Sequence, residues 1–503
     1  MTHHPEHAHH QPDLPADLDE AAHRCLVAGF EGTTAVPDDL KGLIERGLGG
    51  VILFTRNVRD ADQLRGLTER LRELRPDLLV AIDNEGGGIG HLVGAGAPEV
   101  PGNFALGVVD DTELTARCAD ALAGHLASLG ITASYAPVAD LQHQPRNPIV
   151  RTRSFGADPA LVSRQLRAWI TATEARGVAS CAKHFPGHGG TETDSHHDMA
   201  VDPRPYDELA HDIEPFRAAV AAGVPMLMSA HVVYPALDPE RPATLSPRVL
   251  GELLRGDLGF DGVLVSDALE MKAISDRYGE AAGARLALAA GVDQVVVAVA
   301  DLDVTLACRN AVLQALRAGE LPAERVLEAA GRVRQLARRY ATPVVSGPWD
   351  AGAGLEAARR AVRGQALPGP VRGAHVVDLF PPPHPALNWG GEDLLTEVRA
   401  LDPTATGTAV TEEPADLAGL VAEALRGAEG SPLVVAAYDA GLHPWQHRLR
   451  DALLAGRPDA VRVATGLPEP GNAGDAAGAA GGLCSYGRGR VNLRAVAEVL
   501  TGG

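Results

Sequence analysis

Short apolar runs alternate with amphipathic helical stretches from about residue 24 to about residue 300. The runs are continuously apolar, whereas the segments between them, such as DADQLRGLTERLREL, repeat their apolar residues at helical spacing. A continuously apolar strand is typical of a parallel sheet that is buried on both faces. The pattern predicts eight strands, at residues 25–29, 50–54, 78–83, 131–137, 178–185, 225–231, 262–267 and 293–299.

Eight successive strand–helix units predict a (β/α)8 TIM-like barrel. A doubly wound sheet is the alternative, but the chain lacks the G-x-G-x-x-G fingerprint of that fold. The pattern changes after about residue 339, where further strands are predicted at 374–380, 432–439 and 461–466. We expect a disordered His-rich tail over residues 1–20, the barrel over 21–340, a linker over 341–370 and a small α/β sandwich domain over 371–503.

Composition narrows the class of protein. The 503 residues carry a formal net charge of −20, and 45% of them are hydrophobic. This acidity disfavours nucleic acid and anionic membranes as partners, because both need clustered Lys and Arg. The five cysteines form no C-x-x-C motif, no apolar run is long enough to cross a membrane, and the polar N-terminus has no signal-peptide pattern. We therefore expect a cytoplasmic protein, while its oligomeric state stays open.

Polar side chains collect where the predicted barrel strands end. Asp83 follows the third strand, and Lys183 and His184 close the fifth. His231 closes the sixth strand and Asp267 the seventh. Active sites of (β/α)8 barrels lie at the carboxyl ends of the strands. A single polar residue there is usually a turn or capping residue, but several at one edge predict a functional site.

The loop after the fifth strand reads KHFPGHGGTETDSHHDMA and suggests two chemistries. His184 and His188 stand four residues apart, as zinc ligands on a helix do. The Pro-Gly between them breaks a helix and the chain has no H-E-x-x-H motif, so a metal site is the weaker interpretation. The tripeptide Asp194-Ser195-His196 instead places a carboxylate beside an imidazole, and such a pair can donate and accept protons.

Asp267 is the candidate nucleophile. It ends a buried strand in the motif GFDGVLVSDALEM, at the expected active-site rim. A carboxylate at this position can attack an anomeric carbon and form a glycosyl-enzyme intermediate. The alternative is a helix N-cap, because ALEMKAI follows directly.

Five motifs together resemble glycoside hydrolase family 3, and its β-N-acetylglucosaminidase branch in particular. They are DNEGGG, YAPVADLQHQPRNPIVRTRSFGADP, KHFPGHGGTETDSH, PATLS and GFDGVLVSDALEM, which occur in family order between about residues 24 and 340. The second domain resembles the family's second domain more weakly, through HPWQHRLRDALLAGRPDAVRVATGLP. Each motif is moderately specific alone, and their joint occurrence is highly specific.

The resemblance implies roles for individual residues. Asp267 is the catalytic nucleophile, and His196 is the general acid/base with Asp194 as its partner. A further set matches the family positions that hold the hydroxyls and N-acetyl group of the terminal sugar: Asp83, Arg153, Lys183, His184 and, as a pocket histidine at a strand end, His231. The family acts on small carbohydrate substrates, needs no metal or organic cofactor, and retains the anomeric configuration in two steps.

The sequence differs from the family pattern in the segment directly after the third strand. The family often reads EGGRVxR or EGGxVxRL there, and this chain reads EGGGIGHL. Gly88 and His91 therefore stand where charged residues are common. His91 replaces an arginine that would contact the sugar, so we include it among the substrate-binding residues and leave the details of hydroxyl recognition open.

The expected function is that of a retaining exo-β-N-acetylglucosaminidase. It would release terminal N-acetylglucosamine from small glycosides such as cell-wall recycling fragments or chitobiose. A β-N-acetylglucosaminide phosphorylase is the alternative, because a histidine acid/base leaves room for an anionic phosphate that a carboxylate would repel. A non-catalytic sugar-binding protein, in which Gly88 and His91 mark decay, is a further alternative.

Overall fold

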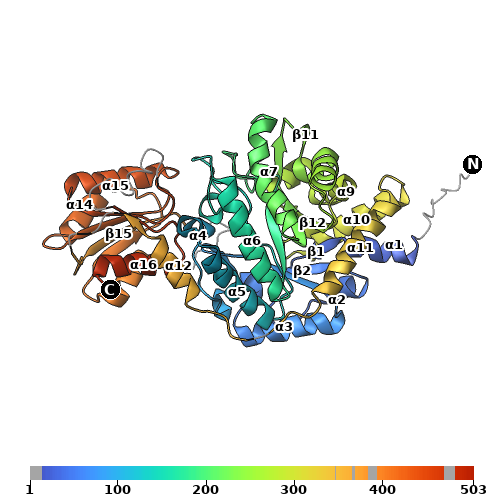
Figure 1. Ribbon diagram of the computed structural model, residues 1–503, viewed down its shortest axis with the longest axis horizontal. Coiled ribbons are helices and arrows are strands. Elements are labelled where there is room, and N and C mark those ends of the chain that lie inside the picture. The colour runs from blue at the N-terminus through green and yellow to red at the C-terminus, as the bar shows by residue number, and fades with distance from the viewer. Residues whose placement is uncertain (1–13, 346, 365–366, 368, 383–392, 469–481) are drawn as a thin grey trace, which may run out of the picture.

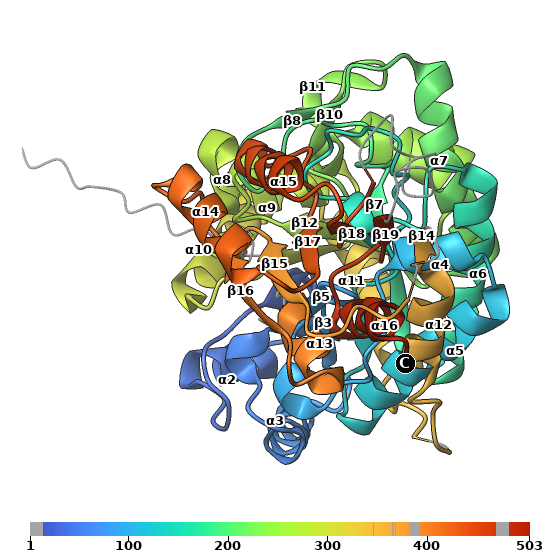
Figure 2. The same cartoon turned by 90° about the vertical axis from the view of Figure 1, so that its left-hand side faces the viewer.

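The computed structural model describes residues 14–345, 347–364, 367, 369–382, 393–468 and 482–503. The chain forms an N-terminal barrel and a smaller C-terminal domain beside it (Figure 1). Figure 2 looks onto the second domain, with the barrel behind it. Among the described residues, no helix is both long and apolar enough to cross a membrane.

All eight predicted strands form one closed, parallel barrel, which confirms the predicted fold class. They pair in chain order, and the last strand pairs back onto the first. The strands are β1 Leu26–Ala28, β2 Gly50–Leu53, β3 Leu79–Ile82, β6 Ala133–Ser134, β7 Ala179–Phe185, β9 Met226–Ser229, β12 Val263–Ala268 and β13 Gln294–Val297.

Burial on both faces explains why the strands are continuously apolar. Val27, Ile52 and Ala81 belong to the core inside the barrel. Their strand neighbours Leu26 and Val51 belong to the core between the barrel and its helices. Successive side chains of a strand point to opposite faces, so both sets must be apolar.

A ring of helices surrounds the barrel (Figure 1). These helices are α1 Ala16–Arg24, α2 Asp38–Glu45, α3 Ala61–Leu74, α4 Asn103–Val109, α5 Thr112–Ser128, α6 Pro159–Ala175, α7 Tyr206–Ala221, α8 Lys272–Tyr278, α9 Glu280–Ala290, α10 Leu302–Arg317 and α11 Ala323–Arg339, with a π-helical segment, η5, at Arg248–Asp257. Local signals start several of them. Asp60, Asp111 and Asp158 accept backbone N–H groups at the N-termini of α3, α5 and α6.

Shorter elements lie in the loops of the barrel. They are β4 Asn84–Gly86, β5 Ile89–Gly90, β8 Ala200–Val201, β10 Val232–Tyr234 and β11 Asp238–Pro242, with the one-turn helices η1 Thr55–Asn57, η2 Val93–Ala95, η3 Arg151–Arg153 and η4 Ala243–Leu245. The β4–β5 hairpin carries Glu85, and η3 carries Arg153.

Helix α11 packs against the amino-terminal end of the barrel. Val333 and Leu336 on this helix join the core inside the barrel. Asp293, which directly precedes β13, is fully buried and pairs with Arg325 and Arg332 of α11 at 2.7 and 3.2 Å. This end is closed by packing, so the loops that can form a site lie at the carboxyl ends of the strands.

The predicted N-terminal tail is too long. Residues 1–13 lie outside the described residues, but 16–20 form the first part of α1 rather than a disordered segment. Leu18, Ala21 and Ala22 of this helix are buried in the core between the barrel and its helices. The apolar positions in the sequence ADLDEAAHR therefore order the chain earlier than the polar composition indicated.

The second domain has a six-stranded sheet with helices on both faces. In the order β14-β19-β18-β17-β15-β16, the strands are Arg363–Gly364, Gly482–Cys484, Val461–Ala464, Leu433–Ala437, His375–Leu379 and Thr406–Val410. The helices are α13 Leu394–Leu401, α14 Leu417–Gly427, α15 Pro444–Gly456 and α16 Arg490–Thr501. The predicted strands are β17, β15 and β18; edge strand β16 is half-exposed and lacked a clear apolar signal.

Helix α12 (Ala353–Ala361) connects the two lobes (Figure 1). It lies within residues 341–370, the predicted linker, and packs against α4 and α5 of the barrel and against α16 of the second domain. Ala357, Ala358 and Ala361 of this helix are buried. Small side chains on that face let the helices approach closely.

Candidate active site

A small pocket opens at the carboxyl ends of the barrel strands. Its volume is about 80 Å³, and its lining includes most of the predicted site: Asp83, His91, Arg153, Lys183, His184, His196 and Asp267. The remaining lining residues are Glu85, Ile89, Ile149, Val150, His188, Ser195 and Met228. Every one of these comes from the barrel, and residues up to 184 positions apart in the chain meet there because parallel strands share one carboxyl edge.

Glu85 forms the centre of the charge network at the pocket. It lies in β4, just beyond Asp83, and only 2% of its side chain is exposed. Lys183 Nζ donates to Glu85 Oε1 at 2.7 Å and to Asp83 Oδ1 at 2.6 Å. Arg153 donates to both carboxylate oxygens of Glu85 at 2.9 Å, through Nε and Nη2. The bidentate pair fixes the plane of the guanidinium.

The buried charges of this network hold each other ionised. Burial by itself would raise the pKa of Glu85, but Arg153 and Lys183 hold that pKa far below its usual value. Burial would likewise lower the pKa of Lys183, and the carboxylates of Asp83 and Glu85 raise it instead. The pocket therefore keeps a fixed pattern of donors and acceptors at neutral pH.

Asp140 orients His184. The carboxylate is completely buried, and its Oδ2 accepts a hydrogen bond from His184 Nδ1 at 2.7 Å. Its Oδ1 accepts the backbone N–H groups of His184 and His188 at 3.0 and 2.8 Å. This hydrogen bond fixes the orientation of the ring. The other ring nitrogen, Nε2, lies on the pocket side, 3.5 Å from Arg153 Nη2.

Asp194 and His196 form a hydrogen-bonded pair. Asp194 Oδ1 accepts from His196 Nδ1 at 2.7 Å and from the His196 backbone N–H at 2.9 Å. Asp194 is mostly buried, and His196 is 29% exposed at the pocket. The pair thus has a fixed ring orientation, with Nε2 on the opposite edge of the imidazole.

A second histidine, His188, fixes the conformation of this loop through two hydrogen bonds. His188 Nε2 lies 3.0 Å from Ser195 Oγ, and its Nδ1 lies 3.0 Å from Thr191 Oγ1. All three side chains are buried. Burial lowers the pKa of His188 to about 4, so its ring is neutral and connects the two ends of the loop by hydrogen bonds.

Asp267 is the last residue but one of β12 and lies partly exposed in the pocket. Burial by itself would raise the pKa of Asp267, but the imidazoles of His184, His231 and His196 and the Ala268 N–H hold it below its usual value. The carboxylate is therefore ionised at neutral pH. It does not cap α8, which begins only at residue 272.

His231 does not line the pocket. It is completely buried, and its ring nitrogens lie 2.8 Å from Thr244 Oγ1 and 3.0 Å from the carbonyl oxygen of Ala268. Both nitrogens are thus occupied by protein groups. The structure thus places His231 beside the strand end that carries Asp267, as a buried neighbour of the pocket rather than part of its lining.

His91 lies at the pocket beside Asp83. Its Nδ1 is 3.0 Å from Thr55 Oγ1, and its ring packs edge-on against Phe54, with ring centroids 5.1 Å apart. Burial lowers the pKa of His91, against the opposing effect of Asp83. The residue that takes the arginine position of the resemblance is therefore neutral.

Metal binding by the histidine-rich loop has no support in its geometry. Across the parts of the chain that the structure describes, no group of three or more His, Cys, Asp or Glu side chains is arranged to hold a metal ion. His184 and His188, the pair with zinc-like spacing, bind Asp140 and Ser195 instead.

Two residues of the site had no role assigned from the sequence. Glu85 follows the third strand two residues after Asp83, and Asp140 lies in the run YAPVADL. A charged residue inside an otherwise apolar run is a signal that could have marked Asp140. The partners of Glu85 lie 68 and 98 positions away, so no local pattern identifies them.

Comparison with known proteins adds a family to this geometry. The model for the glycosyl hydrolase family 3 N-terminal domain matches residues 33–336. A beta-hexosaminidase of Pseudomonas aeruginosa is 39% identical over 274 residues, which cover 54% of this chain and 81% of that protein. Beta-hexosaminidase A of Pseudoalteromonas piscicida is 36% identical over 290 residues, or 53% of this chain, and the match spans only 48% of that longer relative.

Solved structures extend the similarity over both domains. A glycoside hydrolase family 3 beta-N-acetylglucosaminidase from Paenibacillus sp. superposes with a TM-score of 0.87 at 32% identity, covering 96% of each chain. NagZ from Neisseria gonorrhoeae, in complex with N-trifluoroacetyl-D-glucosamine, matches with a TM-score of 0.54 at 33% identity over 64% of this chain and 90% of its own.

The charge network predicts a specific pH dependence of stability. The folded-state pKa of Glu85 is depressed, so its contribution to stability is complete above the unfolded-state pKa of about 4.3 and is lost as the pH falls below that value. Glu85→Gln should lower the free energy of unfolding by about 3–5 kcal/mol at neutral pH, because Lys183 and Arg153 lose their shared carboxylate. Urea denaturation of both proteins across pH measures the difference, which should narrow below about pH 4.

Glu252→Gln is the control, because it removes an exposed carboxyl group of η5. It should leave the free energy of unfolding nearly unchanged. A difference between wild type and Glu85→Gln that stays constant down to acidic pH would contradict the electrostatic interpretation.

Proposed function

The chain belongs to glycosyl hydrolase family 3, and we propose that it is a retaining exo-β-N-acetylglucosaminidase. The observation that carries the proposal is the pairing of Asp267 with the Asp194–His196 dyad across one small pocket. A nucleophilic carboxylate and a proton-transfer group are the two parts that a retaining mechanism needs. The similarity to beta-hexosaminidases supports the same class of enzyme.

In the first step, Asp267 attacks the anomeric carbon of the terminal sugar and forms a covalent glycosyl ester. The bond to the leaving-group oxygen breaks, and this oxygen takes a proton from His196 Nε2. Asp194 stabilises the protonated imidazole through its hydrogen bond to Nδ1. In the second step, His196 takes a proton from water, which attacks the same carbon and releases the sugar with retained configuration.

Asp83, Arg153, Lys183 and His184 are the proposed sugar-binding groups. They form a rigid network whose donors and acceptors point to one pocket. Preorganised groups lose little freedom on binding, which favours recognition of a single ring geometry. The small volume of the pocket supports an exo mode of action on one terminal sugar.

The natural substrates we propose are small intracellular glycosides, such as cell-wall recycling fragments or chitobiose. Two features support this proposal. NagZ, a similar structure, holds an N-acylated glucosamine derivative. All five cysteines of this chain are buried free thiols, which suits a reducing, cytoplasmic setting.

Substitution of Asp267 tests the mechanism. Asp267→Ala should lower kcat/KM for p-nitrophenyl β-N-acetylglucosaminide by at least about 10⁴-fold, because the covalent intermediate cannot form. A 5-fluoro N-acetylglucosaminide should label Asp267 in the wild type, and peptide mass spectrometry locates the label. His211→Ala, at an exposed residue of α7 that does not line the pocket, is the control and should retain activity.

An inactive wild type, or a fully active Asp267→Ala variant, would disprove this assignment. Calorimetric binding of N-acetylglucosamine without turnover would favour the non-catalytic alternative. Covalent label on another residue would identify that residue, and not Asp267, as the nucleophile.

Substitution of His91 tests its role in binding. His91→Ala should raise KM about fivefold with little change in kcat, because one neutral hydrogen bond to the sugar contributes about 1 kcal/mol to ground state and transition state alike. Steady-state kinetics on the same substrate measures the effect. His125→Ala is the matched control, because this imidazole is also buried but packs against Trp349 away from the pocket. Equal KM values for wild type and His91→Ala would show that His91 does not contribute to sugar binding.

Product analysis separates hydrolysis from phosphorolysis. The arginine and the lysine that line the pocket, Arg153 and Lys183, already pair with Glu85 and Asp83, which favours water over phosphate as the acceptor. With chitobiose or muropeptide fragments in phosphate buffer, we expect free N-acetylglucosamine. Accumulation of N-acetylglucosamine 1-phosphate, detected by mass spectrometry or ³¹P NMR, would establish the phosphorylase instead.

A further inference from the structure

One turn of helix carries two arginines that point in opposite directions. This turn is η3, and its last residue, Arg153, reaches Glu85 in the pocket. Its first residue, Arg151, reaches out of the barrel to Asp439 of the second domain. Arg151 Nη2 donates to Asp439 Oδ1 at 2.6 Å, and Nε donates to Oδ2 at 3.1 Å. The two arginines thus connect the pocket to the second domain through a single turn.

The pair between the domains is buried and held from both sides. The exposed fractions of the side chains are 10% for Arg151 and 2% for Asp439. Asp439 Oδ1 also accepts the backbone N–H of Leu467 at 2.8 Å. A Cβ at Gly466 would lie 2.3 Å from this oxygen, so the chain leaves space there for the carboxylate alone. The Asp439 side chain is therefore fixed within its own domain.

On the barrel side, Arg151 needs this support. Its backbone has φ +42°, a left-handed conformation that a non-glycine residue adopts at a cost of about 1–3 kcal/mol. Its N–H donates to Gln142 Oε1, and its Nη1 donates to the Pro145 carbonyl oxygen, both at 2.7 Å. The bidentate pair with Asp439 offsets the strain of the turn. Tyr438 adds a second contact through a hydrogen bond to Thr152.

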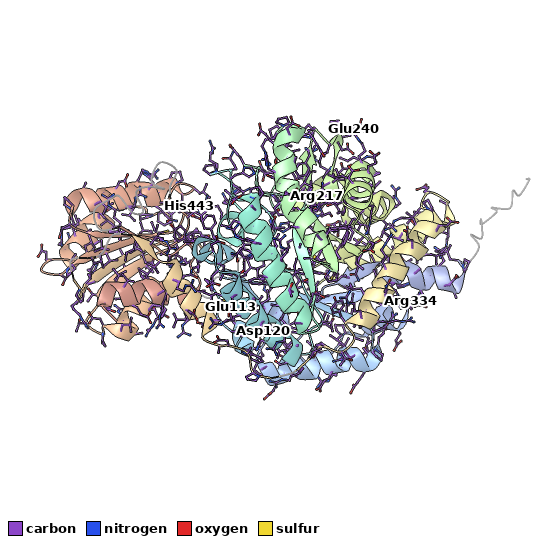
Figure 3. The ribbon with its side chains drawn as sticks, in the orientation of Figure 1. Glu113, Asp120, Arg217, Glu240, Arg334 and His443 are labelled. Atoms are coloured by element: carbon purple, nitrogen blue, oxygen red, sulfur yellow. The ribbon has the colours of Figure 1, made fainter. Side chains whose placement is uncertain are left out.

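The loop that carries Asp439 lies at the edge of the second domain next to the barrel. His443, at the start of α15, lies on the edge of the second domain that faces the barrel (Figure 3). The loop 438–443 between β17 and α15 thus meets the barrel loop 142–153. None of the pocket-lining residues comes from the second domain. The barrel loop is thus one route by which this domain can influence the site, beside the close approach of Gly489 to Gly87 next to the hairpin that carries Glu85.

We propose that Asp439 is a positioning residue for the active site: it holds Arg151, and through η3 it keeps Arg153 against Glu85 at the sugar pocket. The proposal rests on the proposed function, in which Arg153 binds the terminal sugar. It gives the second domain a part in substrate binding without a residue in the pocket.

Asp439→Asn is the first test. The amide keeps the size of the side chain and an acceptor for Leu467 N–H, but it loses the charge that pairs with Arg151. We expect KM for p-nitrophenyl β-N-acetylglucosaminide to rise about tenfold and kcat to fall much less, because a ground-state binding group is displaced. Asp378→Asn is the matched control: Asp378 makes a buried bidentate pair with Arg488, wholly inside the second domain, and accepts the Leu394 N–H. This control should leave KM unchanged.

A double-mutant cycle tests whether Asp439 acts through Arg153. Once Arg153→Ala has removed the positioned group, Asp439→Asn should cause no further rise in KM. Independent multiplication of the two effects, or a wild-type KM for Asp439→Asn, would overturn the proposal. Tyr438→Phe, which removes only a hydroxyl group, should raise KM in the same direction by a smaller factor, and it serves if Asp439→Asn fails to fold by circular dichroism.

Hydrogen–deuterium exchange gives a readout that does not depend on turnover. In Asp439→Asn, faster exchange is expected in residues 142–153, with no change in Asp378→Asn. Unchanged exchange in that loop would overturn the proposal even with an active enzyme. Absence of glycosidase activity in the wild type would instead contradict the proposed function, and the exchange data would still decide whether Asp439 holds the loop.

Discussion

The site depends on one carboxylate, that of Glu85, held between Lys183 and Arg153 at the mouth of the barrel. Buried charges are stable only when they are paired and hydrogen-bonded. Each member of this group therefore requires the others: Glu85 fixes the planes and reach of the two cations, and Lys183 in turn fixes Asp83. The fixed pattern of donors and acceptors that we propose binds the sugar is a consequence of this mutual neutralisation.

Pairing of buried polar groups also orders the loop 186–198 that carries Asp194 and His196. Asp140 ties the end of β7 to the start of the loop through two backbone N–H groups and the His184 ring. His188 then connects to Ser195, the residue between Asp194 and His196. A loop rich in Gly and Thr would have many conformations in solution, but buried polar contacts at both ends limit them. The histidines that suggested a metal site are instead hydrogen-bonded to three different partners: His184 to Asp140, His188 to Ser195 and His196 to Asp194.

The sequence alone predicted the barrel and most of the pocket, because both follow from local patterns. Continuous apolar runs mark strands buried on two faces, and polar residues at their ends share one edge. Ion pairs between residues far apart in the chain could not be predicted from the sequence. Arg151 and Asp439 are 288 positions apart, and nothing near either residue indicates the other. His231 shows that a correctly predicted position does not fix the direction of a side chain. Its place at a strand end was predicted, but the direction of its ring depends on Thr244 and Ala268.

Charge also explains why a histidine suits the proposed acid/base position in this pocket. Asp83, Glu85 and Asp267 already place three carboxylates beside Lys183 and Arg153. A further carboxylate beside Asp267 would raise the pKa of the nucleophile and oppose its ionisation. An imidazole does the reverse, since His196 lowers the pKa of Asp267 when it carries a proton. Asp194 supplies a counter-charge at Nδ1, on the far side of the ring, so it brings no negative charge to the pocket side of the imidazole. The position of Asp194, mostly buried behind His196 rather than in the pocket, follows from that requirement.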